Sequence, residues 1–287
     1  MFGSSKSNDM YSLNHVVFNL VIPPKTLWFN MGLWDNDALE FPEACETLAT
    51  AVINRLDIKK PVFHALHVLD VGYGCGDSCF LLAETYKCRV TGVTNEPTQW
   101  HISKHRLEHE YSALLDMVQL IQGSATEISC LLENRMFDRI LCVDSAYHYQ
   151  TRYDFLKSAY THLLPGGTLA LFDLCLHDSL YPANWITRWI AKSVLQIPTE
   201  NLCTVDDYRE QLATLGYEEV AIETLQQGRV FGGLSRAIQR QIHRAHVWDA
   251  TPSVGNKAFM VITAWMFGLL AKNTWITPII VSAKKKS

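Results

Sequence analysis

The stretch from His67 to Ser78, written HVLDVGYGCGDS, places three glycines at alternate positions directly after an apolar run. The pattern predicts a strand that ends at Gly72 and a helix that begins after Gly76, with Asp70 at the end of the strand. Because a glycine turn has no side chains, a ligand can approach its backbone amides at the start of the helix. The spacing G-x-G-x-G, which includes Gly74, differs from the dinucleotide pattern G-x-G-x-x-G. The stretch therefore predicts a nucleotide-type site of another kind.

A second chemical group follows a predicted buried strand over residues 137–143, where the sequence reads DSAYHY from Asp144. Ligands of open α/β sheets bind at the carboxyl ends of the strands, which is where His148 and Tyr147 stand. Histidine has an ordinary pKa near neutrality and can remove a proton from a hydroxyl, carboxyl or ammonium group. We therefore predict His148 and Tyr147 as catalytic residues. The alternative that His148 only orients its loop stays open.

Three further histidines, His101, His105 and His109, recur at a spacing of four residues and would share one helix face. This spacing could bind a metal ion. The same turns also carry charged side chains such as Lys104 and Arg106, which favours an ordinary solvated helix face. No metal site is predicted.

Strand and helix patterns alternate from about residue 63 onward, which indicates an α/β fold with a mostly parallel, doubly wound sheet. The predicted strands are 67–71, 89–94, 117–122, 137–143, 168–174, 217–225 and 276–283. We expect residues 1–60 to form a helical and aromatic cap, and residues 61–287 to form the main domain. Two apolar helical insertions, at about 176–203 and 228–272, are expected as lids over the ligand-binding edge.

Composition limits the function classes. The formal net charge is −4 and the pI is about 6.2, without a basic stripe, so nothing points to nucleic acid. Eight scattered cysteines without a C-x-x-C pair are typical of reduced intracellular proteins, and the N-terminus has no apolar signal core, so a cytoplasmic location is expected. The apolar run 258–271 is too short to span a bilayer, which predicts no transmembrane segment but leaves weak contact with a membrane surface open. The oligomeric state stays open.

The longer pattern L-D-x-G-x-G-x-G-D resembles the first motif of class I methyltransferases that use S-adenosylmethionine. The resemblance implies a Rossmann-like sheet of seven strands in the order 3-2-1-4-5-7-6, with the last strand antiparallel. It also implies S-adenosyl-L-methionine as the cofactor. Gly72, Gly74 and Gly76 would wrap its methionine half, and Asp70 would hold the turn and approach its ammonium group.

Two later segments extend the resemblance to the nucleoside half of the cofactor. The run GVTNEPTQ resembles the G-[IV]-T-x-S-x-x-Q segment of the coclaurine, sterol and cyclopropane-fatty-acid methyltransferases. It implies that Thr94 and Gln99 address the ribose, with Asn95 as a neighbour and Glu96 as a less favoured acid. In the loop Gly123-Ser124-Ala125, where the family often has Asp-Ala, Ser124 and Ala125 would frame the adenine.

The remaining resemblances concern the acceptor side. The segment AYHYQTR resembles the one that carries a catalytic histidine in phosphoethanolamine N-methyltransferases, and Asp144 before it is assigned to the cofactor. Tyr147 and Met31 replace the Glu and Cys of cyclopropane synthases, so cyclopropanation is not expected. The run WFNMGLW resembles the Y-x-N-x-G-Y-W segment that folds over the cofactor, although an aromatic cluster that only covers the sheet would look the same.

Three functions remain open at this point. The first is methyl transfer to an N or O atom of a small, apolar or aromatic metabolite, such as a natural product. The second is C-methylation of a lipid, sterol or isoprenoid. The third is a cofactor-binding scaffold without catalysis.

Overall fold

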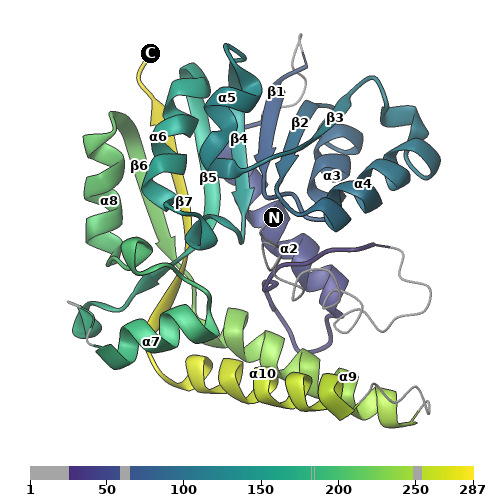
Figure 1. Cartoon of the computed structure of the whole chain (residues 1–287), viewed down its shortest axis with the longest axis vertical. Coiled ribbons are helices and arrows are strands. Elements are labelled where there is room, and N and C mark those ends of the chain that lie inside the picture. The colour runs from purple at the N-terminus through teal and green to yellow at the C-terminus, as the bar shows by residue number, and fades with distance from the viewer. Residues whose placement is uncertain (1–25, 59–64, 182, 184, 248–253) are drawn as a thin grey trace, which may run out of the picture.

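The computed structural model describes residues 26–58, 65–181, 183, 185–247 and 254–287. Its centre is a seven-stranded sheet in the order β3-β2-β1-β4-β5-β7-β6, which confirms the predicted fold class and strand order (Figure 1). The first 25 residues of the predicted cap lie outside the described residues. The strands are β1 (His67–Val71), β2 (Arg89–Thr94), β3 (Val118–Gln122), β4 (Phe137–Val143), β5 (Leu163–Leu176), β6 (Tyr217–Thr224) and β7 (Ile276–Lys285).

The first five strands pair in parallel, so their carboxyl ends meet at one edge of the sheet. β7 runs antiparallel to both β5 and β6 and lies between them. Parallel strands need crossover connections, and helices fill these connections in β1 to β5. This arrangement brings the loops after β1, β2, β3 and β4 to the same edge.

Each face of the sheet carries its own apolar core, because neighbouring residues of a strand point to opposite faces. Val68 of β1 belongs to the core beneath α2 (Phe41–Ile53), α3 (Asp77–Glu84) and α4 (Pro97–His109). Its neighbour Leu69 belongs to the core beneath α5 (Ile128–Leu132), α6 (Arg152–His162) and α8 (Val205–Thr214). The sheet is thus covered on both sides, as nearly continuous apolar strands require.

Short helical turns join several of these elements. They are η1 (Asn54–Leu56), η2 (Ser112–Leu114), η3 (Ala125–Glu127), η4 (Ala146–His148), η5 (Asp178–Leu180), η6 (Thr199–Asn201) and the π-helix η7 (Gly228–Gly232).

The run Pro165-Gly166-Gly167 differs from its prediction as a turn between a helix and a strand. β5 begins at Leu163 and passes through these residues, and it is paired again from Thr168 onward. Between the pairs Phe137–Leu163 and Arg139–Thr168, the longer strand holds its extra residues in a bulge. A positive φ of 73° at Gly166 makes this bulge possible. The motif therefore bends the strand and does not interrupt it.

Three helices form a layer beyond the edge at which the parallel strands end (Figure 1). They are α7 (Trp185–Val194), α9 (Gly233–Val247) and α10 (Val254–Lys272). α9 and α10 pack against each other, and the Ser235 hydroxyl donates a hydrogen bond of 2.6 Å to the Ala264 carbonyl. α7 lies in the first segment predicted as a lid, and α9 and α10 lie in the second; these three helices are called the lid layer below, and their role as lids stays a prediction. Within the described ranges, no helix has the length and apolar character needed to cross a membrane.

Candidate functional site

The glycine turn follows β1 as predicted and has the backbone that only glycine adopts readily. The φ angles of Gly72, Gly74 and Gly76 are 82°, 63° and 101°. A Cβ at Gly72 would overlap the Ser145 hydroxyl, so this glycine lets the loops after β1 and β4 touch. A Cβ at Gly74 would meet nothing within 4 Å. Gly74 therefore leaves an open space beside backbone that can receive a ligand.

Asp70 lies at the end of β1 and is 1% exposed. The Cys79 thiol donates to its carboxylate over 3.4 Å. Burial raises the pKa of Asp70 to about 6, and hydrogen bonds from Ser78 and Cys79 oppose this rise. A buried carboxylate next to an open glycine turn is an environment that favours a cationic ligand group, because the cation would stabilise the ionised carboxylate.

Asp77 and Arg106 form a buried ion pair beneath the turn. Both terminal guanidinium nitrogens of Arg106, Nη1 and Nη2, donate to the Asp77 carboxylate, over 2.8 and 2.9 Å. Nη1 also donates to the Cys75 carbonyl over 2.8 Å. The Leu27 amide donates to the same carboxylate. The predicted solvated face of α4 is therefore wrong for Arg106, which is 3% exposed. His101, His105 and His109 on this helix are exposed, as predicted.

Sequence reasoning missed Arg106 as a residue of the site. Its neighbours along the chain are charged, so composition placed it with them on the solvent side. A sharper signal was available: an acidic residue at the first position of the helix after a glycine turn needs a partner when that helix is buried.

The loops after β2 and β3 hold the predicted nucleoside residues. The Thr94 hydroxyl donates to the Gln99 side-chain oxygen over 3.1 Å, so these two residues act together at the end of β2. Asn95 is exposed beside them. Glu96 caps α4 by accepting a hydrogen bond of 2.8 Å from the Gln99 amide, which gives it a structural task.

At the end of β3, the Ser124 hydroxyl bonds to Thr126 over 2.9 Å and begins η3, while Ala125 is 8% exposed. The amide of Gly123 donates to the Thr94 carbonyl over 2.8 Å, which joins this loop to the end of β2. The predicted adenine and ribose residues therefore occupy adjoining loops at one edge.

The aromatic segment before α2 lies across the glycine turn. Residues 27–30 line a cavity of about 30 Å³ together with Asp70, Gly72 and Gly74. Trp28 is 6% exposed and belongs to the core on the α2 side of the sheet. The segment therefore covers the sheet and borders the glycine turn, and its folding over a bound cofactor stays a prediction.

Asp144 connects this segment to the end of β4. Its carboxylate accepts a hydrogen bond of 2.7 Å from the Met31 amide and one of 2.6 Å from the Tyr147 hydroxyl. Burial raises the pKa of Asp144 to about 7, and these two hydrogen bonds oppose the rise. The Tyr147 hydroxyl is thus committed to Asp144, so its contribution in this structure is to hold the loop.

His148 ends η4 and is oriented through its ring. Its Nδ1 lies 3.2 Å from the Gln196 carbonyl, and since a carbonyl oxygen only accepts, Nδ1 carries the proton. In the neutral ring the lone pair is then on Nε2. Loss of hydration on burial lowers the pKa of His148 to about 4. The ring is therefore neutral at physiological pH and able to accept a proton.

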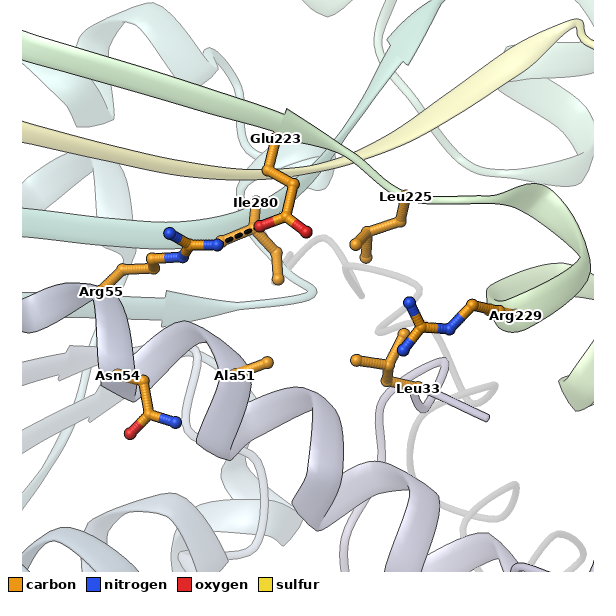
Figure 2. A pocket seen from close by; sticks show the side chains of 8 residues that line it. All are labelled: Leu33, Ala51, Asn54, Arg55, Glu223, Leu225, Arg229 and Ile280. Atoms are coloured by element: carbon orange, nitrogen blue, oxygen red, sulfur yellow. Dashed lines mark hydrogen bonds and ion pairs between the residues drawn. The ribbon is translucent and has the colours of Figure 1, made fainter. Parts of the chain in front are cut away.

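A larger cavity of about 300 Å³ lies elsewhere, between α2, β6, β7 and η7 (Figure 2). Its charged groups are already paired, Arg55 with Glu223 and Arg229 with Asp35. It contains neither the glycine turn nor the residues that follow β4. This cavity therefore shares no lining residue with the predicted site at the strand ends.

Comparison with known proteins agrees with this geometry. Residues 68–167 match the family described as a methyltransferase domain. The erythromycin 3''-O-methyltransferase of Saccharopolyspora erythraea is 32% identical over 204 residues, which are 69% of this chain and 64% of that protein. An O-methyltransferase of Pyrenophora dematioidea is 28% identical over 196 residues, which are 66% of this chain and 68% of that protein. The chain thus spans less than two thirds of the length of the first relative and 68% of the second.

Among solved structures, the [4+2]-cyclase SpnF superposes with a TM-score of 0.73 at 18% identity, over 97% of this chain and 94% of that one. At this identity the likeness shows the fold alone. The solved structure is named as a cyclase and not as a methyltransferase. The family match covers the glycine turn, β1 to β4 and the start of β5. Residues 68–167 are therefore similar in sequence to a methyltransferase domain, and the chain as a whole shares its fold with that solved structure.

Proposed function

We propose that the protein transfers a methyl group from S-adenosyl-L-methionine to an N or O atom of a small, apolar or aromatic metabolite. The observation that carries the proposal is the open glycine turn, flanked by the buried Asp70 and facing the loop of Asp144 and His148. Both relatives described above are named as O-methyltransferases, which supports a heteroatom acceptor.

The chain's residues fit this cofactor. Gly74 leaves room beside the turn, and the carboxylate of Asp70 suits the ammonium group of a methionine moiety. Thr94, Gln99 and Asn95 would hold the ribose, with Ser124 and Ala125 at the adenine. Bound in this way, S-adenosylmethionine supplies an electrophilic methyl group on a sulfonium.

The acceptor has to present a lone pair, and His148 would help by taking a proton. In the tautomer fixed by Gln196, Nε2 accepts the proton of an acceptor hydroxyl or ammonium group while Nδ1 keeps its own. Asp144 and Tyr147 would hold the loop that positions His148. Proximity and orientation would supply the rest of the rate, since the neutral thioether that leaves the sulfonium needs no acid.

Binding is tested first, by calorimetric titration of the purified protein with S-adenosylmethionine. The proposal expects saturable binding, and its absence would refute the proposal. Transfer is then tested with cofactor labelled in the methyl group and a metabolite extract. Label on oxygen or nitrogen supports the proposal, label on carbon shows the C-methyltransferase alternative to be correct, and binding without any transfer leaves a cofactor-binding scaffold.

We also infer a cytoplasmic location. All eight cysteines are free thiols and seven of them are buried, a state that a reducing compartment maintains. Fractionation of cells that produce the protein would place it in the soluble or the membrane fraction.

A further inference from the structure

The lid layer carries an unusual concentration of exposed apolar side chains. Among the described residues, the four most exposed large apolar side chains all lie on α7 and α10. They are Trp185 and Trp189, with 78% and 62% of their surface exposed, and Ile262 and Trp265, with 62% and 65%. Exposed tryptophan is costly in water, and a contiguous set of apolar groups marks a surface that meets another phase or molecule.

Each helix gathers these side chains on one face. Trp185 and Trp189 are four residues apart on α7, and Ile262 and Trp265 are three apart on α10, next to the exposed Val261. Both helices lie in the layer beyond the strand ends (Figure 1). The opposite face of α10 is buried, with Met260, Ala264 and Phe267 in the core, so the exposed stripe is not needed for packing.

The same two helices are basic. Their sequences, WITRWIAKSV and VGNKAFMVITAWMFGLLAK, contain no acidic residue, although the whole chain has a net charge of −4. Arg188 and Lys192 are exposed at three and seven residues from Trp185, on its side of α7. Lys257 and Lys272 are exposed toward the two ends of α10. Tryptophan with flanking lysine and arginine on an amphipathic helix is the composition that binds in the interface of a bilayer.

Charge also argues against a second copy of this chain as the partner. A two-fold interface through this face would bring two basic surfaces without carboxylates together, which is repulsive. An anionic lipid surface instead attracts the cations and accepts the tryptophan rings at the headgroup level. We propose that the exposed faces of α7 and α10 bind the surface of an anionic lipid bilayer, with the helix axes in the plane of the membrane.

This surface does not depend on the methyl-transfer proposal. It does give that site a setting, because the lid layer lies beyond the edge where the strands end. An apolar acceptor dissolved in the bilayer would then reach the lid without crossing water.

The test is cosedimentation of the full chain with vesicles of phosphatidylcholine alone and of phosphatidylcholine mixed in equal parts with phosphatidylglycerol. We expect binding to the mixed vesicles, little binding to the neutral ones, and release at high salt. The tryptophan emission should shift to shorter wavelength on binding. Equal sedimentation with both vesicle types, or none with either, would overturn the proposal.

Three variants locate the surface. The double variant Ile262→Ser with Trp265→Ser should abolish binding to the mixed vesicles. Lys257→Gln and Lys272→Gln should each weaken it by about fivefold. Leu115→Ser, which removes an apolar side chain that is 51% exposed outside the lid layer, is the matched control and should bind like the wild type.

All variants should keep the wild-type circular dichroism, which separates loss of the surface from loss of the fold. Sedimentation equilibrium without lipid tests whether this face instead binds a second copy of the chain. If the wild type forms a dimer that Ile262→Ser with Trp265→Ser dissociates, the face is a self-association surface and the lipid proposal is wrong.

Discussion

His148 and Asp144 both follow β4, and burial shifts their pKa values in opposite directions, so that the pKa of Asp144 lies above that of His148. The pKa of His148 falls to about 4, while that of Asp144 rises to about 7. Between these values both side chains are neutral, so the site does not hold a buried charge pair in the absence of ligand. His148 is therefore neutral over the whole physiological range, with its lone pair on Nε2.

His148→Ala should therefore lower kcat by roughly 10²–10⁴-fold, the range for loss of a general base, with a smaller effect on cofactor binding. In the wild type, protonation of His148 should reduce the rate only as the pH falls toward about 4. The measurement is the initial rate against pH with the acceptor found by the labelling screen. His109→Ala, which removes an exposed ring on α4, is the control. Unchanged turnover of His148→Ala would leave His148 with an orienting role only.

Asp144 makes a prediction about stability. Its pKa is about 7 in the folded protein and near 3.9 when unfolded, so between these values the folded state binds more protons. The free energy of unfolding must then fall as the pH rises from about 4 to about 7. Between pH 5 and pH 8, the free energy of unfolding of the wild type should fall by about 2–3 kcal/mol more than that of Asp144→Asn. Urea unfolding at both pH values measures this difference. The same change in the free energy of unfolding for both proteins would contradict a raised pKa of Asp144 in the folded state.

At the scale of elements, a substitution in the turn after β1 can test ligand binding without unfolding the protein. Gly74→Arg would place a long side chain where a Cβ meets nothing within 4 Å, so the fold should survive while the space for the cofactor is filled. We expect binding of S-adenosylmethionine to be lost in calorimetry, with a loss of stability of about 1 kcal/mol from the positive φ. Gly228→Arg, at a second open glycine, is the control and should bind normally. Retained binding by Gly74→Arg would remove the turn from the site.

The ion pair between Asp77 and Arg106 joins three elements, since it touches the turn, α4 and the segment at Leu27. Arg106→Met should destabilise the protein by about 3–5 kcal/mol, because it leaves the buried Asp77 carboxylate without its cation. The double variant Asp77→Leu with Arg106→Met should recover part of this loss. Denaturant unfolding compares the three proteins. A single variant as stable as the wild type would show that the pair is dispensable.

The elements also show what sequence patterns could predict and why they stopped. β1, β2 and β4 have the predicted bounds, because a buried parallel strand is a short apolar run with clear punctuation. Pro165-Gly166-Gly167 was predicted as a break, yet β4 pairs with β5 on both sides of it. Likewise Arg106 could not be separated from its exposed neighbours, because only the tertiary position of Asp77 decides its burial. The sequence predicted which residues stand at the strand ends, but it could not predict tertiary contacts such as the one between Asp77 and Arg106.

At the scale of the whole molecule, a row of arginines on η7 and α9 clasps the segment that leads into α2. The clasp consists of the pairs Arg229–Asp35, Arg236–Asp37 and Arg244–Glu40. Arg240 adds a hydrogen bond of 2.8 Å to the Leu39 carbonyl and lies over the Trp34 ring. Residues 27–31 at the glycine turn therefore connect, through fewer than ten residues, to the lid layer.

Exposed pairs contribute little singly, about 0–1 kcal/mol each, so the clasp should act through order more than through stability. Asp37→Arg should speed hydrogen exchange of residues 35–40 by a few-fold, and Asp37→Arg with Arg236→Asp should restore protection. The same reversal in the exposed pair Asp206–Arg209 on α8 is the control and should leave residues 35–40 unaffected. Equal exchange in all these proteins would mean that the clasp does not order the segment.

The place of β7 has a consequence for how the chain is made. β7 follows β6 in the chain but lies between β5 and β6, so until it is synthesised β6 has no neighbour in the sheet and β5 has only β4. A nascent chain that stops before Ile276 therefore presents two open strand edges, which invite pairing with other chains. A product truncated before Ile276 should therefore be prone to pair with other chains and aggregate.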